Sequence, residues 1–216
     1  MVQLQPKFVT NAWMTAPWGE FLLLVEDPAN GKAKGYYFNG QMRVETMGVG
    51  PDHAAINNII SVAIALFCAL TGIPLKGLMH GSYRKTGVRE AQPDVSYYVG
   101  ERVALAPQRS AIANLDQVAP PDLAIEIADS CINDDLGKKR LLYEEMQIAE
   151  YWVVDVENAD ILAFQVISQG SQRITQSQVL SGLDMAILGE ALRMAQQMDD
   201  SQVTAWLMAQ FQSRQA

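Results

Sequence analysis

The stretch at residues 121–151, PDLAIEIADSCINDDLGKKRLLYEEMQIAEY, decides the fold, because it predicts a strand, a loop, a helix and a second strand in succession. Side chains alternate between the two faces of a strand, so Leu123, Ile125 and Ile127 share one face. Glu126 therefore lies on the opposite face, as a carboxylate inside an otherwise apolar strand.

The helix expected after this strand carries a lysine. Lys139, Tyr143 and Met146 recur at helical spacing, and residues 151–155, YWVVD, predict the next strand. Candidates for the residue that caps the start of the helix are Ser130, Asn133, Asp134 and Asp135. An acid on a strand and a base on the following helix are placed to face one bound ion or phosphate.

A hairpin is expected nearer the N-terminus, at residues 36–47. Asn39 and Gly40 supply the two positive-φ residues that a two-residue turn requires. Asp52 is then expected to cap a long apolar helix. This segment predicts a β-hairpin followed by a helix that lies across a sheet.

The remaining segments are less regular. Residues 94–99 predict a strand, residues 81–92 a loop or irregular hairpin, and residues 102–120 a connecting loop. Residues 189–198 and 201–211 predict two amphipathic helices. Antiparallel strands flanked by helices indicate an α/β or α+β fold.

The length of 216 residues and the hydrophobic content of 49% suit one domain with a sizeable core. We expect a domain at residues 1–188 and a helical tail at residues 189–216, whose apolar stripe covers either the chain's own core or that of a partner. The apolar run at residues 54–70 is expected to be too short and too polar to span a bilayer. Since no signal peptide is evident, we expect a cytoplasmic protein without a membrane partner.

Four motifs carry a resemblance to a known family. PDLAIEIADS, DLGKKRLLY and AEYWVVD, preceded by QPDVSYYVG, resemble the putative restriction endonuclease family of the PD-(D/E)XK nuclease superfamily, over residues 21–188. The resemblance implies a restriction-endonuclease-like fold, with a mixed central sheet flanked by helices and an N-terminal β-hairpin. It also implies that Asp94 and Glu126 are catalytic. The usual lysine position, two residues after the acid, is Ala128 here, so the resemblance implies that Lys139 takes that role.

The resemblance further implies a metal site. Asp94, Glu126 and the backbone carbonyl of Ile127 would hold Mg²⁺ or Mn²⁺, which prefer hard oxygen ligands. Such an ion lowers the pKa of a bound water and neutralises charge on a scissile phosphate, while Lys139 supports the same charge. On spacing alone, the alternative is that both acids pair structurally with Arg84 or Lys139.

Three further residues are accessory candidates. His53 matches a histidine often found at this place in the family, where a helix N-terminus can accept an anion, although a capping or core role is the alternative. Tyr143 lies one helical turn after Lys139, where it either positions a phosphate or packs. Glu45, on the hairpin, is a distant candidate for a third acidic ligand.

The net charge of −8 argues against a surface coated with DNA contacts, which require clustered lysine and arginine. Basic residues nevertheless concentrate in the first 140 positions. Arg84, Lys85 and Lys138 are the candidate DNA contacts, and an ordinary solvated face is the alternative.

Two functions remain open from the sequence. The first is a metal-dependent DNA endonuclease, for which a homodimer would suit the cutting of two strands. The second is a catalytically inactive nuclease-like domain that serves as a DNA- or protein-binding module. The chain has no GxxxxGK[ST], GxGxxG, HExxH or GxSxG motif, so ATPase, dehydrogenase, zinc peptidase and esterase functions have no support.

Overall fold

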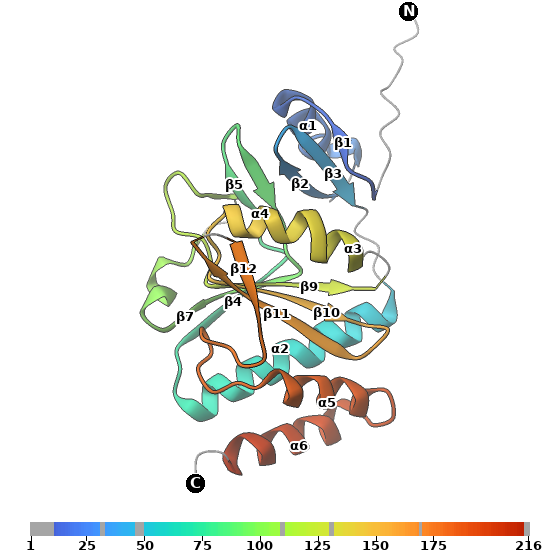
Figure 1. The fold of residues 1–216 in the computed structure, drawn as a ribbon, viewed down its shortest axis with the longest axis vertical. Coiled ribbons are helices and arrows are strands. Elements are labelled where there is room, and N and C mark those ends of the chain that lie inside the picture. The colour runs from blue at the N-terminus through green and yellow to red at the C-terminus, as the bar shows by residue number, and fades with distance from the viewer. Residues whose placement is uncertain are drawn as a thin grey trace, which may run out of the picture.

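A computed structural model of the chain describes residues 11–30, 33–45, 50–108, 111–129, 132–168 and 170–213. Within these ranges the fold consists of two mixed sheets and the helices around them (Figure 1). This confirms the predicted α/β class with a mixed, helix-flanked sheet and an N-terminal hairpin. Ser130, one of the candidate caps named above, lies outside the described ranges.

The central sheet contains the segment that decided the fold. Its only parallel pair among the described strands is β9 with β10, and the helical crossover between them is what a parallel pair requires. The predicted order of strand, loop, helix and strand is therefore confirmed. In spatial order the strands are β12 (Gly170–Ile174), β11 (Asp160–Ile167), β10 (Glu150–Asp155), β9 (Leu123–Ala128), β7 (Val95–Val99) and β4 (Leu75–Met79).

The second sheet is larger than the predicted hairpin. The hairpin itself is confirmed, with Asn39 and Gly40 at φ 50° and 72°. Strands β5 and β6 pair as the irregular hairpin that was one of the two alternatives for residues 81–92, whereas β8, which is too short to show a period, comes from a segment expected to be a connecting loop. In spatial order the strands are β1 (Met14–Thr15), β3 (Gln41–Glu45), β2 (Lys34–Phe38), β6 (Arg89–Ala91), β5 (Tyr83–Lys85) and β8 (Ala113–Asn114).

The helices cover both faces of the central sheet. In chain order they are α1 (Trp18–Val25), α2 (Pro51–Thr71), α3 (Ile132–Asp134), α4 (Arg140–Glu145), α5 (Met185–Ala195) and α6 (Asp200–Ser213), with 3₁₀ segments η1 (Pro28–Asn30) and η2 (Gly100–Leu105) and a π-helical segment η3 (Asp135–Lys139). In Figure 1, α2, α5 and α6 lie on one side of the central sheet, and α4 and the second sheet lie on the other.

The long helix α2 differs from its prediction in two ways. Its N-cap is Gly50 with Pro51 in the first turn, so the prediction that Asp52 caps it was wrong. By length and composition alone α2 is able to cross a membrane, so the expectation that this run is too short and too polar was also wrong. In this fold its buried residues join one apolar core with β7, β9, α5 and α6.

The C-terminal helices belong to that same core. Val203, Leu207 and Phe211 are buried in it, and the ring of Phe211 lies 5.2 Å from that of Phe67. The apolar stripe of the tail therefore covers the chain's own core. The expected boundary between residues 188 and 189 falls inside α5.

The two faces of β9 point to different cores, as the alternation predicts. Leu123, Ile125 and Ile127 pack on the α2 side, whereas Ala124 and Ala128 pack on the side of α4 and the second sheet. Glu126 shares the second face. The carboxylate is therefore directed into the layer between the central sheet, η3 and the hairpin, where all further charged residues of the site are found.

Candidate active site

Asp94, Glu126 and Lys139 come together between the two sheets. Asp94 immediately precedes β7, Glu126 lies on β9 and Lys139 ends η3. A fourth residue, Lys34 at the start of β2, contacts both acids. All four are buried, which is uncommon for charged side chains unless they are paired. The three predicted residues therefore lie together, and Lys34, which the sequence did not predict, lies with them.

Asp94 is held by three groups. Its Oδ1 lies 2.8 Å from Lys34 Nζ, and its Oδ2 accepts a 2.8 Å hydrogen bond from the Ile127 N–H and lies 3.3 Å from His53 Nε2. Burial alone would raise the pKa of Asp94, but these three partners hold it well below its usual range. Asp94 is therefore ionised at neutral pH. Ile127 meets it through the N–H, while a ligand role for the Ile127 carbonyl stays a prediction.

Glu126 has a different environment. Its Oε1 accepts hydrogen bonds from Tyr143 Oη at 2.7 Å and from Tyr36 Oη at 2.9 Å, and its Oε2 lies 3.4 Å from Lys34 Nζ. Burial raises the pKa of Glu126 to about 7, and the nearby charges of Lys139 and Lys34 only partly offset that effect. The metal-free site therefore retains a proton on Glu126 at mildly acidic pH.

Lys139 is fixed by acids of its own. Its Nζ lies 2.9 Å from Asp135 Oδ1 and 3.0 Å from Glu45 Oε1, and 3.9 Å from Glu126 Oε1. It also lies 4.3 Å from the centroid of the Tyr36 ring, within the range of a cation–π contact. Burial alone would lower the pKa of Lys139, but the surrounding carboxylates raise it above the usual value. The ammonium is therefore charged and oriented next to Glu126.

The site contains two more carboxylates than Asp94 and Glu126, those of Glu45 and Asp135, which both contact Lys139. Glu45 is not distant, since its Oε1 lies 3.0 Å from Nζ of Lys139, one of the two lysines that approach Glu126. Burial would raise the pKa of Glu45, but the charges of Lys139 and Lys34 lower it. Asp135, predicted only as a possible cap, is buried and directed inward by η3. Its spacing of four residues from Lys139 was the signal that could have identified the pair.

The charges at this centre do not balance. Among the described residues, five carboxylates and three lysine or arginine cations are linked by ion pairs, which leaves two negative charges when these eight groups are ionised and before His53 and His80, which also contact Asp94, are counted. The acids are Glu45, Asp94, Glu126, Asp134 and Asp135, and the cations are Lys34, Arg43 and Lys139. Burial is the main cause of the raised pKa of Glu126, and the negative charges of Asp94 and Asp135 add to it.

The donor set fits a hard divalent ion. Asp94 Oδ1 and Glu126 Oε2 face one cation, the ammonium of Lys34, which marks the point between them. Mg²⁺ is usually held by one or two carboxylates together with waters and substrate phosphates. Among the described residues, no three His, Cys, Asp or Glu side chains form a ready-made metal cage. Asp94 and Glu126 would therefore supply the protein ligands, and the ion would supply an activated water.

A cavity of about 250 Å³ lies at the two histidines that approach Asp94. His53, Asn57 and His80 line it, and His80 Nδ1 lies 3.9 Å from Asp94 Oδ1. His80 has a left-handed backbone (φ 52°), which is uncommon outside glycine and directs its ring towards the acid. Burial lowers the pKa of His80 below its usual value. Of these residues, only His53 had been predicted as a site residue.

Comparison with known proteins identifies the family and a similar fold. A family model described as putative restriction endonuclease matches residues 18–201. The chain belongs to this family. A crystal structure of a putative nuclease from Anabaena variabilis is similar, with a TM-score of 0.51 and 17% sequence identity, covering 88% of this chain and 98% of that one. At this identity the likeness supports a shared fold, and no curated protein matches the chain.

Membership of the putative restriction endonuclease family supports a nuclease-like function, and hence a nucleic-acid substrate, for the chain. Of the accessory candidates, Tyr143 donates to Glu126, and His53 lies against Asp94. The structural alternative named Arg84 or Lys139 as partners of the acids. Arg84 instead pairs with Glu26 at 2.7 Å and with Glu90, so it does not neutralise either acid.

The candidate DNA contacts of this family member differ in their surroundings. Lys85 is exposed at the end of β5. Lys138 contacts Gln41 and lies 5.0 Å from the centroid of the Trp13 ring. Arg84 is occupied by two acids. Lys85 is thus the one of the three that the described contacts leave most exposed, and the DNA-binding role of all three stays a prediction.

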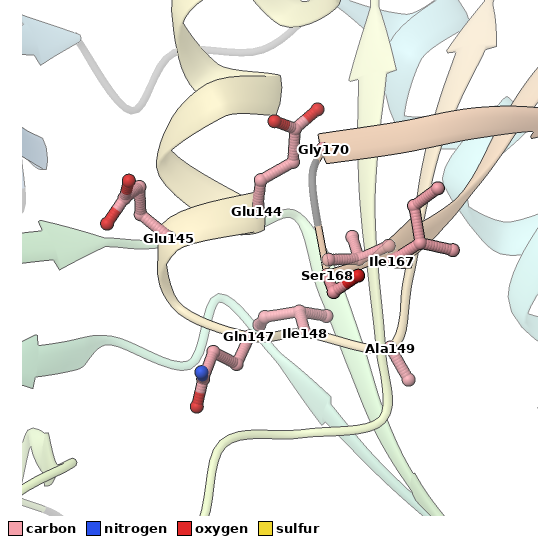
Figure 2. A pocket seen from close by; sticks show the side chains of 9 residues that line it. Glu144, Glu145, Gln147, Ile148, Ala149, Ile167, Ser168 and Gly170 are labelled. Atoms are coloured by element: carbon pink, nitrogen blue, oxygen red, sulfur yellow. The ribbon is translucent and has the colours of Figure 1, made fainter.

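A larger cleft of about 760 Å³ lies elsewhere, at the end of α4 (Figure 2). Glu144, Glu145, Gln147 and Ser168 are among its lining residues. Glu144 is already bonded to Ser171 and lies 3.3 Å from Arg140 Nη1. Neither Asp94, Glu126 nor a lysine lines this cleft, so it is not the site that the family motifs identify.

Proposed function

We propose that the chain is a Mg²⁺- or Mn²⁺-dependent DNA endonuclease that hydrolyses phosphodiester bonds. The observation that supports this most directly is the pair of buried carboxylates, Asp94 and Glu126, which share one cation beside the buried lysine Lys139. The shared cation is the Lys34 ammonium, and the same two carboxylates are a ligand set of the kind that usually holds Mg²⁺ together with waters and phosphates. Family membership supports the same class of reaction.

Each residue has a distinct task in this proposal. Asp94 and Glu126 would hold the ion, which when bound lowers the pKa of a water and neutralises charge on the phosphate. Lys139, kept charged and fixed by Asp135 and Glu45, would stabilise charge that develops on the phosphate oxygens. Tyr143 and Tyr36 orient Glu126 through its Oε1, which leaves Oε2 for the ion.

Cleavage of supercoiled plasmid tests the proposal. With Mg²⁺ or Mn²⁺ the parent should nick the DNA and EDTA should stop it, whereas Glu126→Gln and Lys139→Met should each lose about 100-fold or more, as when a transition-state contact is removed. Glu190→Gln is the matched control, because Glu190 pairs with Arg193 at the surface of α5, across the central sheet from Glu126. Equal cleavage by parent and Glu126→Gln would contradict the assignment.

A second candidate function has an observation in its favour. Lys34 already neutralises both acids, which is what a nuclease-like domain without activity, serving as a DNA- or protein-binding module, would also contain. In that case DNA binding would be independent of Mg²⁺, and no variant would change cleavage because none would occur. A gel-shift assay run beside the plasmid assay separates the two functions.

The proposal extends to assembly. Two copies would allow both strands of a duplex to be cut, as expected from the sequence. Light scattering of the full chain should then give twice the mass of one copy. A monomeric mass, with and without DNA, would refute this part of the proposal and leave the cleavage chemistry untouched.

A further inference from the structure

Lys34 is the buried charge that the proposed chemistry does not use. It opens β2, on the hairpin, and its side chain is 7% exposed. Its Nζ lies 2.8 Å from Asp94 Oδ1 and 3.4 Å from Glu126 Oε2. Among the described residues, its ion pairs are with these two acids, which are also the proposed metal ligands. The Lys34 ammonium therefore lies between the two carboxylates that are proposed to bind the metal ion.

The remaining carboxylate oxygens leave no other place for a bridging ion. Asp94 Oδ2 is taken by the Ile127 N–H at 2.8 Å and by His53. Glu126 Oε1 is taken by hydroxyl groups of Tyr143 and Tyr36. A cation shared by the two acids must bind Oδ1 and Oε2, which Lys34 already contacts. Since Mg²⁺ lies about 2.0–2.1 Å from its ligand oxygens, the ammonium and the ion cannot occupy this point together.

We propose that Lys34 is a built-in competitor of the divalent ion: its ammonium holds the two acids together without metal and is expelled when the metal binds. This inference rests on the proposed metal-dependent function. Lys34 is suited to leaving, because its charge is carried on a flexible four-carbon stem. Lys139 is suited to staying, because Asp135 and Glu45 hold it at 2.9 and 3.0 Å.

The competition has two consequences. The metal-free chain avoids leaving two adjacent buried carboxylates without a counter-charge, so it stays folded without the ion. Binding of the ion requires the release of Lys34, so the observed affinity for metal is lower than the two acids alone would give. An expelled ammonium beside the site would then be free to contact a phosphate of the substrate.

Calorimetric titration of the full chain with Mn²⁺ tests the inference. We expect Lys34→Met to bind Mn²⁺ at least about tenfold more tightly than the parent, because a positive charge about 3 Å from the ligand oxygens is removed. Arg193→Met, which removes a surface charge on α5, should bind like the parent. Lys34→Gln is measured as well, as a second variant in case Lys34→Met does not fold, since the glutamine amide still donates hydrogen bonds but carries no charge.

The outcomes separate this inference from the proposed function. Tighter binding by either folded Lys34 variant supports the competition, even if no protein cleaves DNA, in which case the nuclease function alone fails. Equal or weaker binding by the folded variants, with clear binding by the parent, overturns the competition and leaves the function intact. Absence of Mn²⁺ binding in the parent and in the Lys34 variants overturns both.

Discussion

Replacing Glu126 with glutamine tests how the buried carboxylate is compensated in the absence of metal. Glutamine keeps the shape and the capacity to accept from Tyr143 and Tyr36, but it carries no charge. Burial raises the pKa of Glu126 to about 7 from an ordinary value of 4.5. A raised pKa on an acid means that its contribution to stability is complete below pH 4.5 and is lost as the pH rises through about 7.

The size of the change in unfolding free energy follows from the rise in the pKa of Glu126. At about 1.4 kcal/mol per pH unit, the rise from 4.5 to about 7 corresponds to roughly 3 kcal/mol of unfolding free energy. The parent loses this amount between pH 4.5 and pH 8, whereas Glu126→Gln has no carboxyl group to titrate. The unfolding free energy of the variant minus that of the parent should therefore increase by about 3 kcal/mol over this range.

Urea unfolding at pH 5, 6, 7 and 8 in EDTA measures this difference. Glu150→Gln is the matched control, since Glu150 is also buried but accepts from Trp152 Nε1 at 3.0 Å and Ser177 Oγ at 2.8 Å without a lysine. It should be destabilised, because an amide N–H₂ would replace one accepting oxygen. If Glu126→Gln is instead less stable than the parent by about 3–5 kcal/mol at pH 8, Glu126 is an ionised partner of the lysines, and the reasoning is refuted.

Three further predictions concern the same centre and the core below it. Asp94→Asn should lower the unfolding free energy by about 3–5 kcal/mol at pH 7, because Lys34 loses its nearest partner. Since the pKa of Asp94 is held low, this loss of unfolding free energy should shrink as the pH falls below about 4. A loss that is constant with pH would contradict the prediction. Tyr143→Phe removes one hydroxyl donor to Glu126 and should cost about 1 kcal/mol in urea unfolding, with no change contradicting the hydrogen bond. Phe211→Ala should cost about 3–5 kcal/mol in thermal unfolding, and a cost under about 1 kcal/mol would show that α6 is not part of the core.

The βαβ segment was predictable because its signals are local. Alternation along Leu123, Ile125 and Ile127 gives the buried face of β9, and its period places Glu126 on the other face. Asn39 and Gly40 give the hairpin turn through their backbone preference. The short strands β5, β6 and β8 carry too few residues for a period, so the hairpin of β5 and β6 was only one of two alternatives for residues 81–92, and β8 could not be predicted.

The site was predictable only in part, since its contacts join residues far apart in the chain. Asp94 and Glu126 were identified through the family motifs. Lys34 precedes those acids by 60 and 92 positions, and one lysine at the start of a strand gives no periodic signal. Asp135 had the local signal of a cap, which concealed its ion pair with Lys139. The four-residue spacing of Asp135 and Lys139 could have identified that pair from the sequence, whereas Lys34 could be found only from the fold.

Anomalous diffraction from crystals soaked in Mn²⁺ tests the central claim most directly. The account predicts one peak about 2.0–2.2 Å from Asp94 Oδ1 and Glu126 Oε2, with Lys34 Nζ moved away from both oxygens. The parent should be compared with Glu126→Gln, in which the peak should be absent. Crystals of the parent that show no peak at Asp94, with Lys34 still bridging the two acids at saturating Mn²⁺, would contradict the claim that this centre binds a divalent ion.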